Sequence, residues 1–315
     1  MNDTKYRLVT RSDFDGLACA VLLRHIDLID EITFVHPKDM QDGKVPISGS
    51  DITTNLPYVP GVHIAFDHHH SETIRVDSVE NHIIDAESPS AARVVWNHYG
   101  GADTFPDRWF DMMAAVDKAD SAQYSRDEIL DPTGWDLLNF MMDPRTGLGR
   151  FREFTVSNYS LMMSMIDYCK DHPIDEVLRM PDVVERIELY FEHEDLAKEQ
   201  ILRCGTVHDN LVVLNLRGED TIYACNRFII YALFPQCNIS IHELWGREKQ
   251  NIVFAVGKSI LDRSCTTDIG ELMLGYDGGG HHAAGTCQIP IENAASTLDE
   301  LIAQINSDQI GLAAA

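Results

Sequence analysis

Short apolar runs that alternate with helical stretches restrict the fold of this chain more than any other feature of its sequence. The runs with the length and apolar character of buried strands are residues 6–10, 32–36 and 62–66. The stretches with the pattern of helices are residues 17–29, 91–99 and 109–119. Strands that alternate with helices predict a parallel sheet covered on both faces. Such sheets bind their ligands at the carboxyl ends of the strands.

The second half of the chain repeats this alternation on a smaller scale. From residue 158 to 204 the pattern is helical, and residues 182–204 are rich in Glu and Leu, which predicts one long helix. Strand and helix patterns return from residue 211 onward. We therefore predict an α/β protein of two domains. Its parts are a larger parallel-sheet domain over residues 1–180, a helical linker over 181–205 and a smaller α/β domain over 206–315.

The charge of the chain restricts its partners. Fifty Asp and Glu residues against 25 Lys and Arg give a formal charge of −25. Long nucleic acid is not an expected partner, because that binding relies on Lys and Arg neutralising phosphates. A small anionic substrate fits this charge if local cations or metal ions reverse the field at the site. The alternative is that the acidity mainly keeps the protein soluble.

The cysteines and the apolar runs indicate the compartment. Seven cysteines, an odd number without a CxxC pair, argue against a disulfide framework and against a zinc–thiolate site. The first residues, MNDTKYRLVT, contain no apolar signal region, and no run approaches eighteen apolar residues. We expect a cytoplasmic protein that does not bind membranes.

Two polar clusters follow predicted strands. Asp13 and Asp15 flank one residue at a strand-to-helix turn, where side chains two apart point the same way and two carboxylates favour a cation between them. The alternative is a helix N-terminus that attracts acids. Residues 67–70 (DHHH) follow another strand, and consecutive imidazoles are costly to bury without partners. Carboxylates mixed with imidazole suit Mn²⁺, Mg²⁺, Fe²⁺ or Zn²⁺, whereas a solvated loop is the alternative.

Three further aspartates are less specific when taken singly. Asp51 follows a short polar run. Asp117 and Asp120 stand three apart at the end of a predicted helix and so lie near each other on one face. Because an acid at a helix C-terminus is mildly unfavourable, a compensating cation is plausible there.

A glycine- and histidine-rich segment lies near the C-terminus. Its candidate substrate-binding residues are Gly278, Gly279, Gly280, His281 and His282. Successive glycines let a ligand approach the backbone closely, and free N–H groups in such a loop can bind an anion. We interpret the small residues that follow as a helix start, and a flexible turn is the alternative. Arg263 and Ser264 supply further phosphate contacts upstream.

Together these motifs resemble those of the DHH phosphoesterase superfamily, in the branch whose C-terminal domain ends in a GGGH loop. In chain order, the matching positions are residues 12–16 (SDFDG), Asp51, residues 67–69 (DHH), Asp120 with Asp117 as the alternative, and residues 278–281 (GGGH). The resemblance spans nearly the whole chain. It implies a metal-binding catalytic domain over residues 1–180 and a substrate-binding domain over 206–315.

The resemblance also implies ligands and roles. One or two divalent ions are expected, Mn²⁺ first, with Mg²⁺ or Co²⁺ as alternatives. The implied metal ligands are Asp13, Asp15, Asp51, His68 and Asp120. Asp67 would hold the metal ligands in place without binding the ion itself, and His69 and His281 would contact phosphate.

The sequence departs from the family pattern at one place. Members often carry a histidine ligand four or two residues before the first aspartate, where this chain has Val9 and Arg11. Either one ion binds weakly, or His36 replaces the histidine, or Arg11 takes over part of the charge by binding phosphate. Arg11 is therefore a catalytic candidate beside Asp67, His68 and His69.

The predicted reaction is hydrolysis of phosphate esters by metal-activated water. We expect a short oligonucleotide or a small phosphorylated nucleotide as the substrate. An exopolyphosphatase-like phosphoanhydride hydrolase is the alternative. A nucleotide-binding protein whose catalysis has decayed is a second alternative, motivated by the missing histidine. A homodimer is compatible with each.

Overall fold

The computed structural model describes residues 4–151 and 153–313. The chain divides into two compact units. The first comprises residues up to 123 together with 132–144 and 149–188, and the second comprises residues 124–131, 145–148 and those from 189 onward. Helix α10 (Pro181–Cys204) covers the predicted linker. The boundary between the units falls inside this helix, at residue 188, and two short segments before it belong to the second unit.

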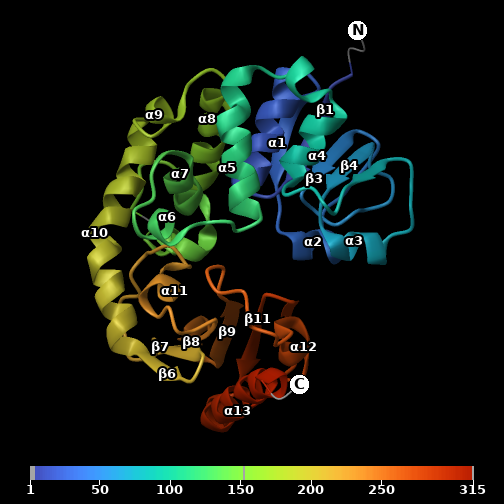
Figure 1. Cartoon of the computed structure of the whole chain (residues 1–315). Coiled ribbons are helices and arrows are strands. Elements are labelled where there is room, and N and C mark those ends of the chain that lie inside the picture. The colour runs from blue at the N-terminus through green and yellow to red at the C-terminus, as the bar shows by residue number, and fades with distance from the viewer. Residues whose placement is uncertain (1–3, 152, 314–315) are drawn as a thin grey trace. The chain divides into compact units, whose positions relative to one another are not determined.

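The first unit is built on a five-stranded parallel sheet (Figure 1). Its strands are β1 (Tyr6–Thr10), β2 (Ile29–Phe34), β3 (Asp51–Thr54), β4 (Ile64–Asp67) and β5 (His82–Ile84). They lie in the order β2-β1-β3-β4-β5, and every pair is parallel. The chain therefore moves from β1 to one side and later crosses to the other side, so the strand order reverses between β1 and β3. Doubly wound sheets bind ligands at such a switch point, beyond the carboxyl ends of the strands.

Most helices of the first unit pack on this sheet around one large apolar core, and smaller clusters, one of them including Met40 of α2, lie beside it. The helices of the first unit are α1 (Phe14–His25), α2 (Pro37–Gln41), α3 (His70–Arg75), α4 (Ala91–His98), α5 (Phe110–Asp120), α7 (Gly134–Met142), α8 (Asn158–Cys169) and α9 (Ile174–Val177). Helix α1 is central to them, because it contacts α4, α5 and α8 (Figure 1). All of its residues from Leu17 to Leu23 are fully buried. The parallel sheet predicted from the strand–helix alternation is thus confirmed.

The turn from β1 into α1 is tightly built. Asp13 caps the helix, and its Oδ1 accepts a hydrogen bond of 2.9 Å from the N–H of Gly16. A Cβ atom on Gly16 would lie 2.0 Å from the carbonyl oxygen of Arg11, so only glycine fits there. This packing fixes the positions of the two residues on either side of Phe14.

The second unit contains a six-stranded mixed sheet in the order β10-β11-β9-β8-β7-β6. Its strands are β6 (Gly205–His208), β7 (Leu211–Asn215), β8 (Ile239–Trp245), β9 (Ile252–Lys258), β10 (Gly279–His281) and β11 (Ala284–Ile289). Only β7 and β8 are parallel among its pairs in the described residues. Its helices are α6 (Arg126–Leu130), α11 (Ile229–Leu233), α12 (Ile269–Leu274) and α13 (Ala294–Ala313). This second α/β unit agrees with the predicted fold class.

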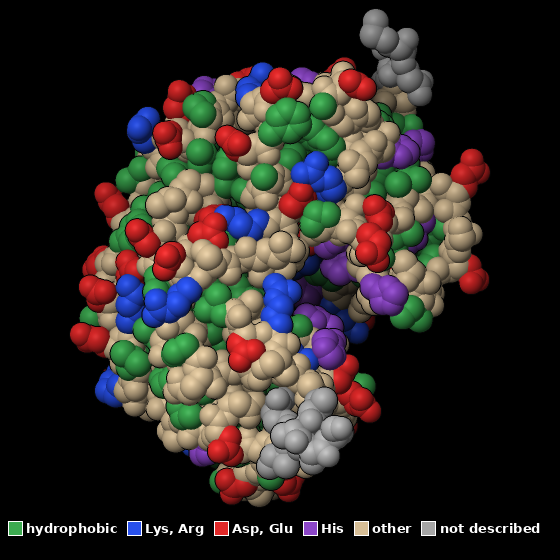
Figure 2. All heavy atoms as spheres, viewed as in Figure 1, with side chains coloured by type: hydrophobic (Ala, Val, Ile, Leu, Met, Phe, Trp, Pro, Cys, Tyr) green, Lys and Arg blue, Asp and Glu red, His purple; other side chains and the backbone are tan. Residues whose placement is uncertain are grey.

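Short 3₁₀ helices connect several of these elements. They are Gly101–Asp103, Asp107–Trp109, Pro144–Thr146, Leu148–Arg150, Arg247–Lys249 and Ile291–Asn293. Within the described residues, no helix combines the length and the apolar character that crossing a membrane requires. Acidic side chains are spread over the face of the molecule in Figure 2, as the formal charge of −25 leads one to expect.

Candidate active site

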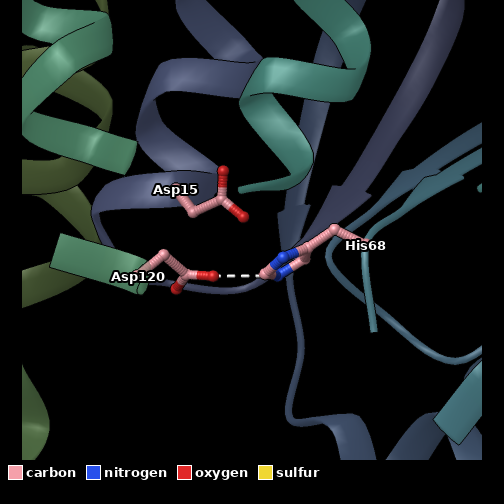
Figure 3. Close-up of side chains that lie close together, drawn as sticks. All are labelled: Asp15, His68 and Asp120. Carbon is pink, nitrogen blue, oxygen red and sulfur yellow. Dashed lines mark ion pairs between the residues drawn. The ribbon is translucent and has the colours of Figure 1, made fainter. Parts of the chain in front are cut away.

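Three side chains capable of binding a metal meet at the carboxyl end of the parallel sheet. Asp15 comes from the first turn of α1, His68 directly follows β4, and Asp120 is the last residue of α5. One ligand atom from each lies within 4.8 Å of the others, and Figure 3 shows the side chains pointing toward one another. Among the described residues, this is the only such group of His, Cys, Asp and Glu. We call these three residues the metal group.

Asp15 is the buried member of the metal group. Its carboxylate accepts hydrogen bonds from the N–H groups of Ala91 (3.0 Å) and Ala92 (2.7 Å), at the start of α4. These bonds orient both oxygens and favour the charged form. Burial and the negative charge of Asp120 outweigh them and raise the pKa of Asp15 to about 7. A carboxylate in this position is stabilised by a cation.

His68 and Asp120 form the more accessible part of the metal group. The Nε2 atom of His68 lies 2.8 Å from Oδ2 of Asp120 but has no well-directed hydrogen bond. On the other side of the ring, Nδ1 lies 3.3 Å from the carbonyl oxygen of Ser88. A proton on Nδ1 donated to that carbonyl leaves Nε2 to bind a metal, as is usual for ligating histidines.

The charges of these residues are coupled. Burial alone would lower the pKa of His68, but contact with Asp120 and its charge outweigh burial and raise the pKa to about 9. Burial would likewise raise the pKa of Asp120, but contact with His68 lowers it. Without a metal, His68 therefore carries a proton that a divalent ion must displace.

The residues around His68 hold the loop after β4 in place. Asp67 is fully buried, and its Oδ1 accepts hydrogen bonds from the backbone N–H of His68 (2.8 Å) and from Nδ1 of His69 (2.7 Å). Burial would lower the pKa of His69, but Asp67 raises it. Because Nδ1 is bound to Asp67, Nε2 is the nitrogen of His69 left for a ligand. The role of Asp67 in supporting the metal ligands stays a prediction, and these hydrogen bonds show which groups it holds.

Arg11 and Asp13 form an ion pair beside the metal group. The Nε atom of Arg11 lies 3.0 Å from Oδ2 of Asp13. Both side chains are partly exposed, so they are accessible to solvent. Asp13 is thus held by a cation of the chain itself, whereas Asp15, two residues later, has no cationic partner of this kind among the contacts that the structure describes.

Asn55 is a site residue that sequence reasoning missed. It follows β3 directly and is only 1% exposed, and its Nδ2 lies 3.5 Å from Oδ1 of Asp13. Its Oδ1 is buried and has no hydrogen-bond partner in the described structure. Its φ of 56° lies in the left-handed region, which Asn, Asp and Gly tolerate best. The signal in the sequence is its place after the strand that neighbours β1.

Asp51, which we expected to bind metal, lies outside the metal group in this structure. Asp51 begins β3, so it lies at the amino end of the strand, about 10 Å of backbone from the carboxyl end. Its carboxylate binds Nε of Arg7 (2.7 Å) and the N–H of Ser48 (2.6 Å). Burial would raise its pKa, but Arg7 and Ser48 lower it. Asp51 therefore stabilises the sheet at the end away from the metal group.

Two other candidates also lie outside the metal group. Asp117 accepts a hydrogen bond of 2.9 Å from Nε of Arg93 and one of 2.8 Å from Oγ of Ser90. Of the two candidate aspartates in α5, the structure thus brings Asp120 to the group. His36 is exposed and caps α2, where its Nδ1 accepts a hydrogen bond from Lys38. It does not replace the missing histidine in this arrangement.

The glycine- and histidine-rich segment is a β-hairpin, which corrects the predicted helix start. Gly279, Gly280 and His281 form edge strand β10, and the chain turns back into β11 at Ala284. A Cβ atom on Gly280 would lie 2.3 Å from the carbonyl oxygen of Ala284, so the hairpin needs glycine there. The side chain of His281 is exposed, and its Nδ1 accepts a hydrogen bond of 3.2 Å from Ala283.

A lysine missed by the sequence analysis lies next to this hairpin. The Nζ atom of Lys258 lies 2.9 Å from Nε2 of His282, whose Nδ1 lies 3.1 Å from Oδ2 of Asp268. Nearby in the sequence, Nε of Arg263 donates to the carbonyl of Ile260 at 3.4 Å. This part of the second unit can bind an anion through Lys258. The signal in the sequence is a lysine at the end of a strand pattern.

Asn238 orients the last of the expected phosphate contacts. Its Nδ2 donates a hydrogen bond of 2.9 Å to Oγ of Ser264, and the N–H of Ser264 donates to Oδ1 of Asp262 at 3.0 Å. Gly278 packs closely, because a Cβ atom there would lie 2.3 Å from the carbonyl oxygen of Thr286. The structure thus keeps all the expected residues of this segment within the second unit.

The residues of the metal group fit a hard divalent ion. Two carboxylates and one imidazole nitrogen are the ligand types that Mn²⁺ and Mg²⁺ accept. The raised pKa of Asp15 and the unpaired amide oxygen of Asn55 show polar atoms that the protein alone leaves incompletely stabilised. A divalent ion would bind Asp15, His68 and Asp120 and stabilise the charged form of Asp15.

The chain matches no protein-family model and no curated protein. Among solved structures, it is 67% identical to a pGpG-specific phosphodiesterase, PggH, from Vibrio cholerae, with a TM-score of 0.88 over 96% of this chain and 100% of the other. An exopolyphosphatase-related protein from Bacteroides fragilis matches with a TM-score of 0.53 and 15% identity over 96% of this chain and 93% of the other. The exonuclease RecJ bound to manganese matches with a TM-score of 0.50 and 13% identity over 100% and 91%.

These similarities differ in what they establish. The two structures below 25% identity share the fold, while the Vibrio protein is a full-length relative. The motif Asp67-His68-His69 lies at the carboxyl end of the sheet, beside the two aspartates of the metal group. The chain belongs to the DHH superfamily of metal-dependent phosphoesterases.

Proposed function

We propose that this chain is a Mn²⁺-dependent phosphodiesterase that hydrolyses the linear guanine dinucleotide pGpG. The observation that carries this proposal is the identity of 67% to the pGpG-specific phosphodiesterase, over the full length of that protein. The metal group and the DHH motif supply residues for the reaction. The negative formal charge agrees with a short substrate rather than a long one.

The residues of the first unit would share the chemistry as follows. Asp15, His68 and Asp120 hold the ion, which supplies Lewis acidity for a water molecule and for the phosphate. Asp67 fixes the ring of His69 through Nδ1, so Nε2 can donate a hydrogen bond to a phosphate oxygen. Arg11 supplies a second positive charge for that phosphate.

The residues of the second unit would bind the substrate. Lys258, held by His282 and Asp268, offers an ammonium group for a phosphate. The expected contacts are Gly278, Gly279, Gly280, His281, His282, Arg263 and Ser264. Because glycine leaves the edge strand β10 without side-chain bulk, a ligand can approach its backbone closely.

Product analysis on a small panel of substrates tests this function. We would incubate the protein with Mn²⁺ and pGpG, pApA, a 3′-phosphorylated nucleotide or polyphosphate, and compare kcat/KM. Preference for pGpG, lost in His68→Ala, supports the proposal. Release of phosphate mainly from polyphosphate would favour the exopolyphosphatase-like alternative. Binding of pGpG without turnover under Mn²⁺, Mg²⁺ and Co²⁺ would favour a protein whose catalysis has decayed.

The ion, the compartment and the assembly are also proposals. Mn²⁺ is supported by the mixed ligand set and by the manganese-bound RecJ structure of the same fold. Cell fractionation would test the cytoplasmic location, and light scattering would test for a homodimer. Comparing activity at matched concentrations of Mn²⁺, Mg²⁺ and Co²⁺ would test the ion.

A further inference from the structure

We infer that this chain binds one divalent ion at the metal group and that the guanidinium of Arg11 neutralises Asp13 in place of a second ion. The inference rests on the metal-dependent activity proposed above and concerns how that site is built. It is carried by the contacts of three residues outside the metal group, which are Arg11, Asp13 and Asn55.

The residues before Asp13 leave no place for an imidazole ligand. Val9 is the fourth of the five residues of β1 and is fully buried, within an apolar cluster that includes Met40 and Leu56. Its side chain packs within this apolar cluster and does not reach the polar residues at the carboxyl end of the sheet. Arg11 stands at the other position from which a histidine could reach, and it is bound to Asp13. Both positions are therefore committed to other contacts.

The carboxylate of Asp13 is already satisfied by groups of the protein. Its Oδ2 lies 3.0 Å from Nε of Arg11. Its Oδ1 accepts the capping hydrogen bond from Gly16 at 2.9 Å and lies 3.5 Å from Nδ2 of Asn55. An ion that used Asp13 as a ligand would have to displace a guanidinium, which keeps its charge at any pH that a protein tolerates.

The residue after β3 carries no charge. Asn55 occupies the position next to Asp13 at the switch point of the sheet, where a carboxylate would attract a second ion. Its amide oxygen is buried and unpaired in the described structure. An amide oxygen can bind a metal without adding negative charge. Asn55 can therefore assist a single ion, but it cannot balance a second one.

The charges at the site balance for one ion. Asp15 and Asp120 contribute two negative charges, which equal the charge of one divalent ion. Asp13 and Arg11 neutralise each other. A second divalent ion would bring two positive charges close to the guanidinium and to the first ion, and the metal group has no further carboxylate to offset them, while Asp67 is bound by the N–H of His68 and by Nδ1 of His69. Repulsion between charges in a partly buried site is large, so binding of the second ion is disfavoured.

Counting the ions tests this inference directly. We would strip the protein of metal, titrate it with Mn²⁺ by isothermal titration calorimetry, and record the Mn²⁺ EPR spectrum of the loaded protein. One ion per chain with the spectrum of an isolated ion is expected. Two ions per chain, or the exchange-coupled spectrum of ions about 4 Å apart, would overturn the inference.

A variant that restores the second metal site tests the inference from the opposite direction. In the double variant Arg11→His and Asn55→Asp, a ligand and a negative charge replace the guanidinium and the neutral amide. We expect it to bind two Mn²⁺ ions with an exchange-coupled spectrum. Asp tolerates the left-handed backbone at residue 55, so the fold should survive, and circular dichroism would verify this. A folded double variant that still binds one ion contradicts the inference.

A matched control separates the effect of position from that of composition. Arg24→His replaces an arginine by histidine in the last turn of α1, where Arg24 pairs with Asp167 and not with the metal group. It should bind one ion, as the wild type does. Because the ions are counted without substrate, one ion with no hydrolysis of pGpG would refute the proposed function alone. Two ions with hydrolysis would refute only the inference.

Discussion

Asp15 and His68 link metal binding to protonation. In the folded protein without metal, the pKa of Asp15 is about 7 and that of His68 is about 9. Their ordinary values in unfolded chains are about 4 and about 6.5. For both groups the folded pKa is the higher one, so the folded state binds protons that the unfolded state has released. The stability that these groups contribute is complete below their unfolded-state pKa values, and it is lost between about pH 4 and pH 7 for Asp15 and between about pH 6.5 and pH 9 for His68.

The metal-free protein should therefore become less stable as the pH rises from about 4 to about 9. We expect its unfolding temperature to fall over this range, and saturating Mn²⁺ to reverse the fall, because the ion replaces the protons. Thermal unfolding at several pH values, with EDTA or with Mn²⁺, measures both effects. The control Asp15→Asn should flatten the part of the curve between about pH 4 and pH 7. An unchanged slope in that variant would refute the pKa assigned to Asp15.

Replacing His68 should separate metal binding from folding. The ring of His68 supplies Nε2 to the metal group, and its Nδ1 lies 3.3 Å from the carbonyl oxygen of Ser88. We expect His68→Ala to lower kcat on pGpG by about 100-fold or more, because the bound ion is lost. The unfolding temperature without metal should change by only a few degrees. A folded variant that keeps full activity would show that His68 is not a metal ligand, and a variant that is unfolded without metal would show that the ring is needed for folding.

At the scale of elements, the two ends of β3 have different roles. Asp51 at its amino end stabilises the sheet through Arg7, whereas the loop after its carboxyl end adjoins the site. We expect Asp51→Asn to leave the Mn²⁺ count unchanged and to lower the free energy of unfolding by about 1.5–3 kcal/mol, the range for a hydrogen bond to a charged group. We expect Asp120→Asn to lose the bound Mn²⁺ ion and to leave the free energy of unfolding of the metal-free protein nearly unchanged. Calorimetric Mn²⁺ titration and urea unfolding measure the two effects. A lost ion in Asp51→Asn would restore Asp51 as a ligand.

The sequence predicted elements well where the apolar pattern was long. Strand β1, helix α1 and the strand before His68 were found because their apolar runs end in polar clusters. Strand β3 was missed because it has only four residues, DITT, three of them polar yet all buried. Without β3, Asp51 could not be placed at the amino end of a strand. Asn55 was missed with it, since an amide gives no signal unless its strand is known.

The hairpin at Gly278 was misjudged for a related reason. Glycine and alanine carry little propensity that distinguishes a helix start from an edge strand. Pairing of β10 with β11 decides the conformation, and that pairing depends on β9 across the sheet. Contacts between strands that are distant in the sequence are not visible in local patterns. The same reason explains why Lys258, at the end of β9, was not connected with His282.

Lys258 should affect substrate binding more than chemistry. Its ammonium group is positioned by His282 and Asp268 in the second unit. We expect Lys258→Met to raise KM for pGpG about tenfold with little change in kcat, because a contact to phosphate that is equal in the ground state and transition state acts on KM alone. Steady-state kinetics measures this, with Lys249→Met, on the same unit but without these partners, as the control. A large fall in kcat would give Lys258 a different role.

At the scale of the whole molecule, the negative charge of the protein disfavours binding of long nucleic acids. The net formal charge of −25 arises from 50 acidic residues, and they are spread over the face that Figure 2 shows. A dinucleotide carries few phosphates and can be held by the ion and a few cations. A longer strand must place further phosphates near acidic side chains. These side chains repel the phosphates and cannot displace counterions from them, so the extra length adds no binding free energy.

The preference for short substrates should therefore depend on salt. We expect kcat/KM on pGpG to exceed that on a guanine-containing 12-mer by at least about tenfold at low ionic strength, an effect of the whole charge distribution. At 0.15 M salt the Debye length is about 8 Å, so repulsion between the extra phosphates and the protein surface is screened and the ratio should shrink. Rates at a series of salt concentrations measure this, with a neutral osmolyte at matched osmolarity as the control. A ratio that is independent of salt would mean that steric exclusion, and not charge, limits the length of the substrate.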